Sequence, residues 1–153
     1  MSSELDEVQA MIQEMVIEDA REVYSETVID HAMNSRNAGI IENADGYAKV
    51  TGSCGDTMEV WLKVNNNIIT EINFMTDGCG TSIASGSMMT EMAKGKSIGE
   101  AGSISQQDIL TGLGGLPEES EHCALLSANT LKTAIRDYLA LKKEPWKKAY
   151  RKH

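Results

Sequence analysis

Hydrophobic and polar residues alternate in the middle of the chain as half-buried β-strands require. Over residues 58–64 every second position is apolar, and the same period returns over residues 68–76. Three asparagines at 65–67 separate these segments, and asparagine tolerates the left-handed backbone of a tight turn. A shorter segment, 47–51, follows Asp45-Gly46. The pattern therefore predicts three antiparallel strands joined as a meander.

Apolar residues recur at helical spacing on both sides of these strands. Before them, the spacing over residues 5–16 predicts a helix that continues through Ile29 to Met33 and stops in the turn-forming residues 34–39. After them, Ile83, Met88, Met89 and Met92 predict a helix that follows Asp77-Gly78-Cys79-Gly80 and ends near Gly95.

The last third of the chain alternates between short helical segments and loops. Ser97 caps one predicted short helix, and residues 105–110 form another. The glycine-rich residues 111–117 are predicted to be a loop without the spacing of a phosphate-binding motif. A long helix is expected from His122 or Cys123 to about Leu141, before Pro145. Its predicted inner face comprises Leu126, Leu131, Ile135, Tyr138 and Leu139.

These elements predict an α+β fold, with a three-stranded antiparallel meander sheet and helices packed on one face. Residues 1–22 carry seven acids and one arginine, whereas residues 142–153 carry six lysines or arginines and one glutamate. We therefore expect an acidic helical extension at 1–22, one domain at 23–141 and a basic, solvated tail at 142–153.

Composition narrows the class of function. The 153 residues have a formal net charge of −9, which disfavours nucleic acid and anionic membranes as partners. No apolar run approaches the length of a membrane span, and the first residues do not resemble a signal peptide, so a cytoplasmic location is expected. Three cysteines in such a chain favour metal or thiol chemistry over disulfides.

The three cysteines lie where predicted elements meet. Cys54 and Cys79 each occupy a glycine-flanked loop at a strand end, and Cys123 begins the long helix. The N-terminus of the helix after Cys79 favours thiolate over thiol. Asp56 and His122 accompany them as further ligand types, so three thiolates and one harder ligand could share a metal. Without a close Cys-x-x-Cys pair, a turn-capping Asp56 and a structural His122 remain equally open readings.

Several motifs resemble one family. The segment Tyr24-Ser25-Glu26-Thr27-Val28-Ile29-Asp30-His31 is similar to the opening of the U-type iron–sulfur cluster scaffolds, the IscU and NifU N-terminal family. The segments around Cys54-Gly55-Asp56, Gly78-Cys79-Gly80, Lys94-Gly95-Lys96-Ser97, Leu116-Pro117 and His122-Cys123 follow in the family's order. The resemblance extends from about residue 23 to residue 141.

The resemblance implies a scaffold, not an enzyme, that assembles a labile 2Fe–2S cluster from iron and sulfur delivered by a cysteine desulfurase. The cluster then passes to apo-proteins. Cys54, Cys79 and Cys123 would be thiolate ligands, Asp56 or His122 the fourth ligand, and Cys123 the acceptor of persulfide sulfur, in an accessible loop. Zinc could occupy the same ligands in the cluster-free form. Whether two copies form a homodimer around the cluster stays open.

One departure limits which partners the resemblance implies. In bacterial housekeeping scaffolds the Leu-Pro pair continues as Pro-Val-Lys and is bound by a dedicated heat-shock chaperone. Here Leu116-Pro117 continues as Glu118-Glu119-Ser120-Glu121, so the resemblance does not extend to that chaperone.

Two alternatives compete with the scaffold. The first is a zinc-dependent sulfur-transfer protein that relays persulfide sulfur from a desulfurase. Members of the scaffold family with that function carry an insertion between the second and third cysteines. Only 43 residues lie between Cys79 and Cys123, which leaves no obvious room for that insertion. The second is a structural zinc domain, which usually uses paired cysteines.

Overall fold

A computed structural model describes residues 2–150, without the side chains at positions 2, 3, 13, 17, 149 and 150. The helices are α1 (Ser2–Arg21), α2 (Glu26–Met33), α3 (Gly80–Ala93), α4 (Ile98–Gly102), α5 (Gln106–Leu113) and α6 (Glu121–Lys143). The strands are β1 (Gly46–Thr51), β2 (Thr57–Asn65) and β3 (Ile68–Thr76). Short 3-10 turns, η1 (Glu118–Ser120) and η2 (Pro145–Tyr150), flank α6.

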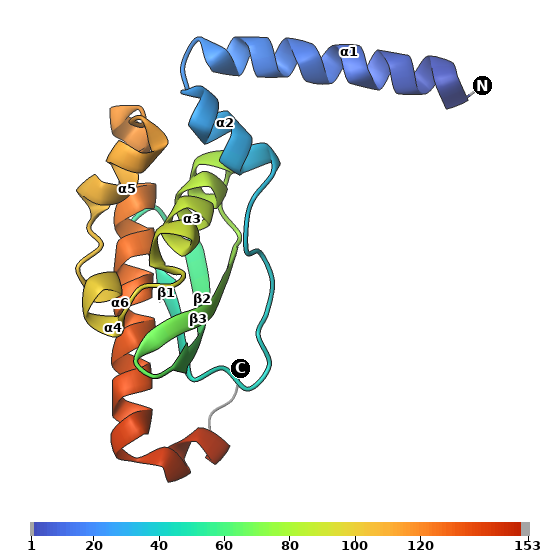
Figure 1. Cartoon of the computed structure of the whole chain (residues 1–153). Coiled ribbons are helices and arrows are strands. Elements are labelled where there is room, and N and C mark those ends of the chain that lie inside the picture. Colours follow the sequence, from blue (N-terminus) through green and yellow to red (C-terminus); the bar gives the residue numbers. More distant parts are fainter. Residues whose placement is uncertain (1, 151–153) are drawn as a thin grey trace.

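The three strands form an antiparallel sheet in the order β1-β2-β3, which confirms the predicted meander and α+β class. Helices α6 and α3 cover one face of this sheet, and α2 packs against α3 (Figure 1). The apolar positions of the alternating pattern are buried beneath these helices, among them Met58, Val60, Leu62, Ile72 and Phe74. The strand period thus aligns one apolar row with the helices and builds the core.

The opposite face of the sheet carries a small second core, which the alternation did not predict. Trp61 lies on this face but is only 2% exposed, and it packs with Ile41, Ala44 and Tyr47. The segment before β1 reaches this face because its residue Ala38 pairs alongside Phe74 at the edge of β3. The prediction that helices pack on one face of the sheet is therefore confirmed. A loop, which was not predicted there, covers part of the opposite face of the sheet.

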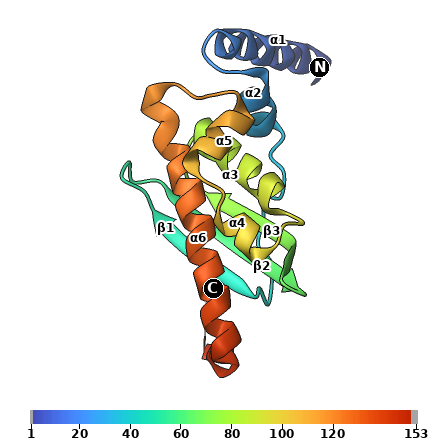
Figure 2. The ribbon, with the colours of Figure 1, turned by 60° about the vertical axis from the view of Figure 1, so that its left-hand side comes forward.

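The first predicted helix is in fact two helices. The helical conformation is interrupted at residues 22–25. Ser25 caps α2, and its hydroxyl oxygen accepts a hydrogen bond from the Val28 backbone N–H at 3.1 Å. The same hydroxyl donates to the carbonyl of Leu113. A local cap therefore begins α2, and the capping hydroxyl also contacts a distant segment. As a result α1 lies beyond α2 at one end of the domain, and η2 lies at the other end (Figures 1 and 2).

Two other helical predictions needed correction. Residues 111–113, predicted as loop, are the last turn of α5, which ends at Gly114 with its φ of 78°. Within that turn Gly112 lies against the Met88 side chain. Leu139, predicted to face inward on α6, is 42% exposed, whereas Leu126, Leu131 and Ile135 are buried as expected. Among the described residues, no helix is long and apolar enough to cross a membrane.

Candidate metal centre

The loop between β1 and β2 presents Cys54 and Asp56. This loop is closed by backbone hydrogen bonds from Gly52 N–H to the Asp56 carbonyl at 2.8 Å and from Gly55 N–H to the Gly52 carbonyl at 3.0 Å. Gly55 has a φ of 90°, a conformation that a side chain would strain. Cys54 is exposed and Asp56 is half-buried. The turn thus projects a thiol and a carboxylate from one short segment.

Cys79 is the residue that caps the N-terminus of α3, directly after β3. Its thiol lies 3.1 Å from the Thr81 hydroxyl and is exposed. The Thr81 hydroxyl lowers the pKa of Cys79, and the backbone N–H groups of Thr81 and Ser82 lower it further, against opposing effects of burial and of Asp56. The helix N-terminus therefore favours the thiolate, as the sequence predicted.

His122 and Cys123 lie in the first turn of α6. The Nε2 atom of His122 is 3.7 Å from the Cys123 sulfur. His122 is half-buried, but Cys123 is only 2% exposed, which contradicts the expectation of an accessible thiol. The reason is that α6 begins against α3, whose residues Thr81 and Ser82 contact the Cys123 sulfur.

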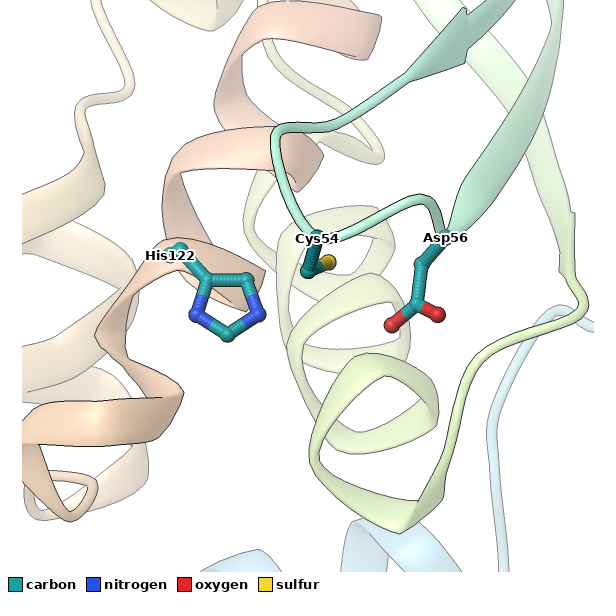
Figure 3. A group of neighbouring side chains, drawn as sticks. All are labelled: Cys54, Asp56 and His122. Carbon is teal, nitrogen blue, oxygen red and sulfur yellow. The ribbon is translucent and has the colours of Figure 1, made fainter.

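Cys54, Asp56 and His122 form a group of potential metal ligands. One ligand atom from each residue lies within 4.8 Å of the other two (Figure 3). Zinc binds sulfur at ~2.3 Å and nitrogen or oxygen at ~2.0–2.2 Å, so small side-chain movements would bring all three atoms onto one ion. The set combines sulfur, oxygen and nitrogen, which suits zinc and iron.

Two buried hydroxyls connect this group with the other two cysteines. The Thr81 hydroxyl lies 3.1 Å from the Cys79 sulfur and 3.4 Å from the Cys123 sulfur. The Ser82 hydroxyl is 3.1 Å from Asp56 Oδ2 and 3.4 Å from the Cys123 sulfur. All five residues predicted as candidate ligands therefore lie in one continuous polar group.

Sequence reasoning missed Thr81 and Ser82. They follow Cys79 within the same motif, and their place in the first turn of a helix was the available signal, because hydroxyl residues there can contact groups beyond the helix end. Gly78 was likewise not assigned a role. A Cβ atom at Gly78 would lie 2.4 Å from the Ser82 hydroxyl oxygen and 2.8 Å from Asp56 Oδ2, so only glycine leaves room for their contact.

Comparison with known proteins identifies the family. The model of the NifU-like N terminal domain matches residues 23–145. The chain belongs to this family. It is 49% identical over 117 residues to an iron–sulfur cluster assembly scaffold protein IscU of Archaeoglobus fulgidus, with 76% of each chain covered. It is 46% identical over 120 residues to the protein of that name from Escherichia coli, covering 75% of this chain and 93% of the other.

A solved structure of the family supports the fold. The N-terminal part of a nitrogen-fixing NifU-like protein from Brucella abortus superposes with a TM-score of 0.62, at 22% identity, over 77% of this chain and 95% of that one. The resemblance to the NifU-like family noted in the sequence is confirmed. Helix α1, by contrast, lies outside the family match, which begins at residue 23.

Proposed function

We propose that this protein is a scaffold on which an iron–sulfur cluster is assembled and from which the cluster passes to other proteins. The observation that carries this proposal is the convergence of three cysteines, an aspartate and a histidine from three separate segments. The named role of relatives 46–49% identical to this chain supports it. The protein would act as a carrier of cargo, and the cluster would be that cargo.

The thiolates of Cys54, Cys79 and Cys123 are the proposed cluster ligands, because iron in such clusters is held mainly by cysteine. Asp56 and His122 are the candidates for the fourth position, and we assign it to Asp56. Its carboxylate already contacts Ser82, which in turn contacts Cys123. A carboxylate is a harder ligand than a thiolate, so its bond to iron would be the easiest to exchange. We infer a 2Fe–2S cluster on this ligand set.

Sulfur would arrive as a persulfide of a cysteine desulfurase. A thiolate of the scaffold attacks the outer sulfur, the S–S bond of the donor breaks, and the donor thiolate leaves. The resemblance assigns Cys123 as acceptor, and its burial against Thr81 and Ser82 of α3 means that the surrounding residues must move before a donor can reach it. Zinc in the cluster-free protein would use Cys54, Asp56 and His122 together with one further thiolate.

The remaining partner assignments follow from the same role. Apo iron–sulfur proteins would receive the cluster, and a homodimer around one cluster is a proposed intermediate. Glu118 and Glu119, both exposed, and Ser120 follow Leu116-Pro117, where the chaperone-binding motif has proline, valine and lysine, so we do not propose the heat-shock chaperone as a partner.

Anaerobic reconstitution with iron, a cysteine desulfurase and excess cysteine tests the proposal. The cysteine thiols also supply the two electrons that reduce each persulfide sulfur to sulfide, and are themselves oxidised to disulfide. We expect a visible chromophore with equal amounts of iron and sulfide, and its transfer to an apo-ferredoxin. Asp56→Ala should lengthen the lifetime of the bound cluster and slow transfer, whereas Glu119→Ala, a matched loss of an exposed carboxylate nearby, should change neither. An unchanged transfer rate in Asp56→Ala would exclude Asp56 as the exchangeable ligand.

The competing function has a distinct outcome in the same experiment. If the protein were a zinc-dependent sulfur relay, zinc would stay bound, no chromophore would form and desulfurase turnover would rise. The relatives named as iron–sulfur scaffolds do not favour this alternative.

A further inference from the structure

Helix α1 presents an apolar stripe that the other described residues leave exposed. Leu5, Val8, Ile12, Met15 and Val16 are each between 52% and 70% exposed. They recur at the spacing that places residues on one helix face. Helix α1 extends away from the domain, and the C-terminal end of α1 lies next to α2 (Figures 1 and 2). Contiguous exposed apolar surface of this kind marks an interaction site.

The stripe leads into a cavity beside the candidate metal centre. This cavity has a volume of about 280 Å³ and is lined by α1, α2 and the beginning of α3. Val16 and Ala20 line it from α1, Val28 and Ala32 line it from α2, and Cys79 lies at its edge. Val16 belongs both to the exposed stripe and to the cavity wall, so the two form one apolar groove that ends at Cys79.

The charge around the groove restricts what can occupy it. Residues 1–22 carry seven carboxylates and one arginine, and that arginine, Arg21, pairs with Glu26 at 2.7 Å. A second copy of α1 would bring the same negative charge to the interface. The described part of the chain's own basic segment, η2 with Lys147 and Lys148, lies at the opposite end of the molecule from the groove (Figure 1).

We propose that this groove, formed by α1, α2 and the Cys79 end of α3, binds a basic amphipathic helix of a partner protein. An apolar face of the partner helix would pack on the stripe and enter the cavity, and its lysines and arginines would lie against the carboxylates of α1. This is the helix-in-groove mode of recognition, with complementary charge favouring the encounter. The bound helix covers Cys79, and any consequence for cluster exchange rests on the proposed function.

Binding is tested with the metal-free full-length protein and a synthetic 18-residue helix of leucine and lysine that has one apolar face. The control peptide has the same composition in an order without an apolar face. We expect the amphipathic peptide to bind at least tenfold more tightly, measured by fluorescence anisotropy. Since neither iron nor sulfide is added, failure of this experiment is separate from failure of the scaffold proposal.

Matched variants locate the interaction. Val8→Gln combined with Ile12→Gln replaces two apolar residues in the middle of the stripe without changing charge, and glutamine is a good helix former. This variant should lose at least tenfold in affinity, while Ala10→Gln, an exposed position on the opposite face of α1, should bind as wild type. Circular dichroism checks that both variants keep the helix content of the wild type.

A second measurement ties the groove to Cys79. Alkylation of the metal-free protein by iodoacetamide, followed by peptide mapping, should show Cys79 protected at least fivefold by the amphipathic peptide and Cys54 unprotected. Equal binding of the two peptides, or equal binding by wild type and the glutamine variant, would overturn the proposal. So would concentration-dependent self-association of the wild type that the glutamine variant abolishes, because a second copy would then occupy the groove.

Discussion

The contact between α3 and the sheet at Gly86 determines how closely the helix that carries Cys79 approaches the core. A Cβ atom added at Gly86 would lie 2.5 Å from Cδ2 and 2.6 Å from Cε2 of the Phe74 ring. Phe74 is 2% exposed, and its backbone is fixed by hydrogen bonds with Asn37 and Gly39, so the ring cannot simply move aside. In Gly86→Ala the helix and the ring must therefore separate.

Overpacking of this kind costs about 1–3 kcal/mol, and the better helix propensity of alanine offsets ~0.5–1 kcal/mol. We therefore expect Gly86→Ala to lower the free energy of unfolding by up to about 2.5 kcal/mol, or a few degrees in Tm, since ~1 kcal/mol corresponds to about 2–4 °C at this size.

Urea unfolding followed by circular dichroism measures this change. Gly99→Ala is the matched control, because Gly99 lies in α4 with no heavy atom within 4 Å of the added Cβ. The control should be as stable as the wild type or more so, by up to ~1 kcal/mol. If Gly86→Ala were as stable as Gly99→Ala, the close contact between α3 and Phe74 would be refuted.

Three further predictions follow from named contacts. Burial lowers the pKa of His31 in the folded protein, so the unfolded protein binds more protons at this residue. The free energy of unfolding should therefore fall as the pH drops below about 6.5. His31→Gln should weaken that pH dependence in urea titrations. Thr81→Val should raise the pKa of Cys79, seen as a shift of the pH profile of alkylation to higher pH, whereas Thr81→Ser should leave the profile unchanged. Ser25→Ala should cost about 1 kcal/mol or more in thermal unfolding, through loss of the α2 cap and of its bond to Leu113; no loss would contradict that role.

The strands were predictable because local pattern alone determines them. The period-2 alternation and the asparagine turn placed β3 at Ile68–Thr76, as the structure has it. The predictions failed where the local structure involves contacts with residues far away in the sequence. The hydrogen bond from Ser25 to Leu113 and the burial of Trp61 against Ile41 and Ala44 both join segments that are far apart in the sequence. No local periodicity encodes either contact.

The same distinction applies to the metal centre. Cys54, Cys79 and Cys123 could be brought together in prediction because each lies at the end of an element, and the meander returns two of those ends to one edge of the sheet. The burial of Cys123 could not be foreseen, because it depends on how α6 packs against α3. That packing also places Thr81 and Ser82 between the candidate ligands, which makes two unassigned positions of the motif part of the candidate site.

Under the proposed function, this packing implies an order of release. Cys79 and Cys123 lie on helices that form part of the core, and moving either would disturb the packing of α3 on α6. Cys54 and Asp56 lie instead on a five-residue turn, where a Cβ atom added at Gly55 would meet no heavy atom within 4 Å. This turn can swing away once Asp56 releases the Ser82 hydroxyl, because Cys54 is already exposed and the turn is no part of a helix or strand. Transfer of the cluster should therefore begin on the side of Cys54 and Asp56, with the two helix-borne thiolates released last.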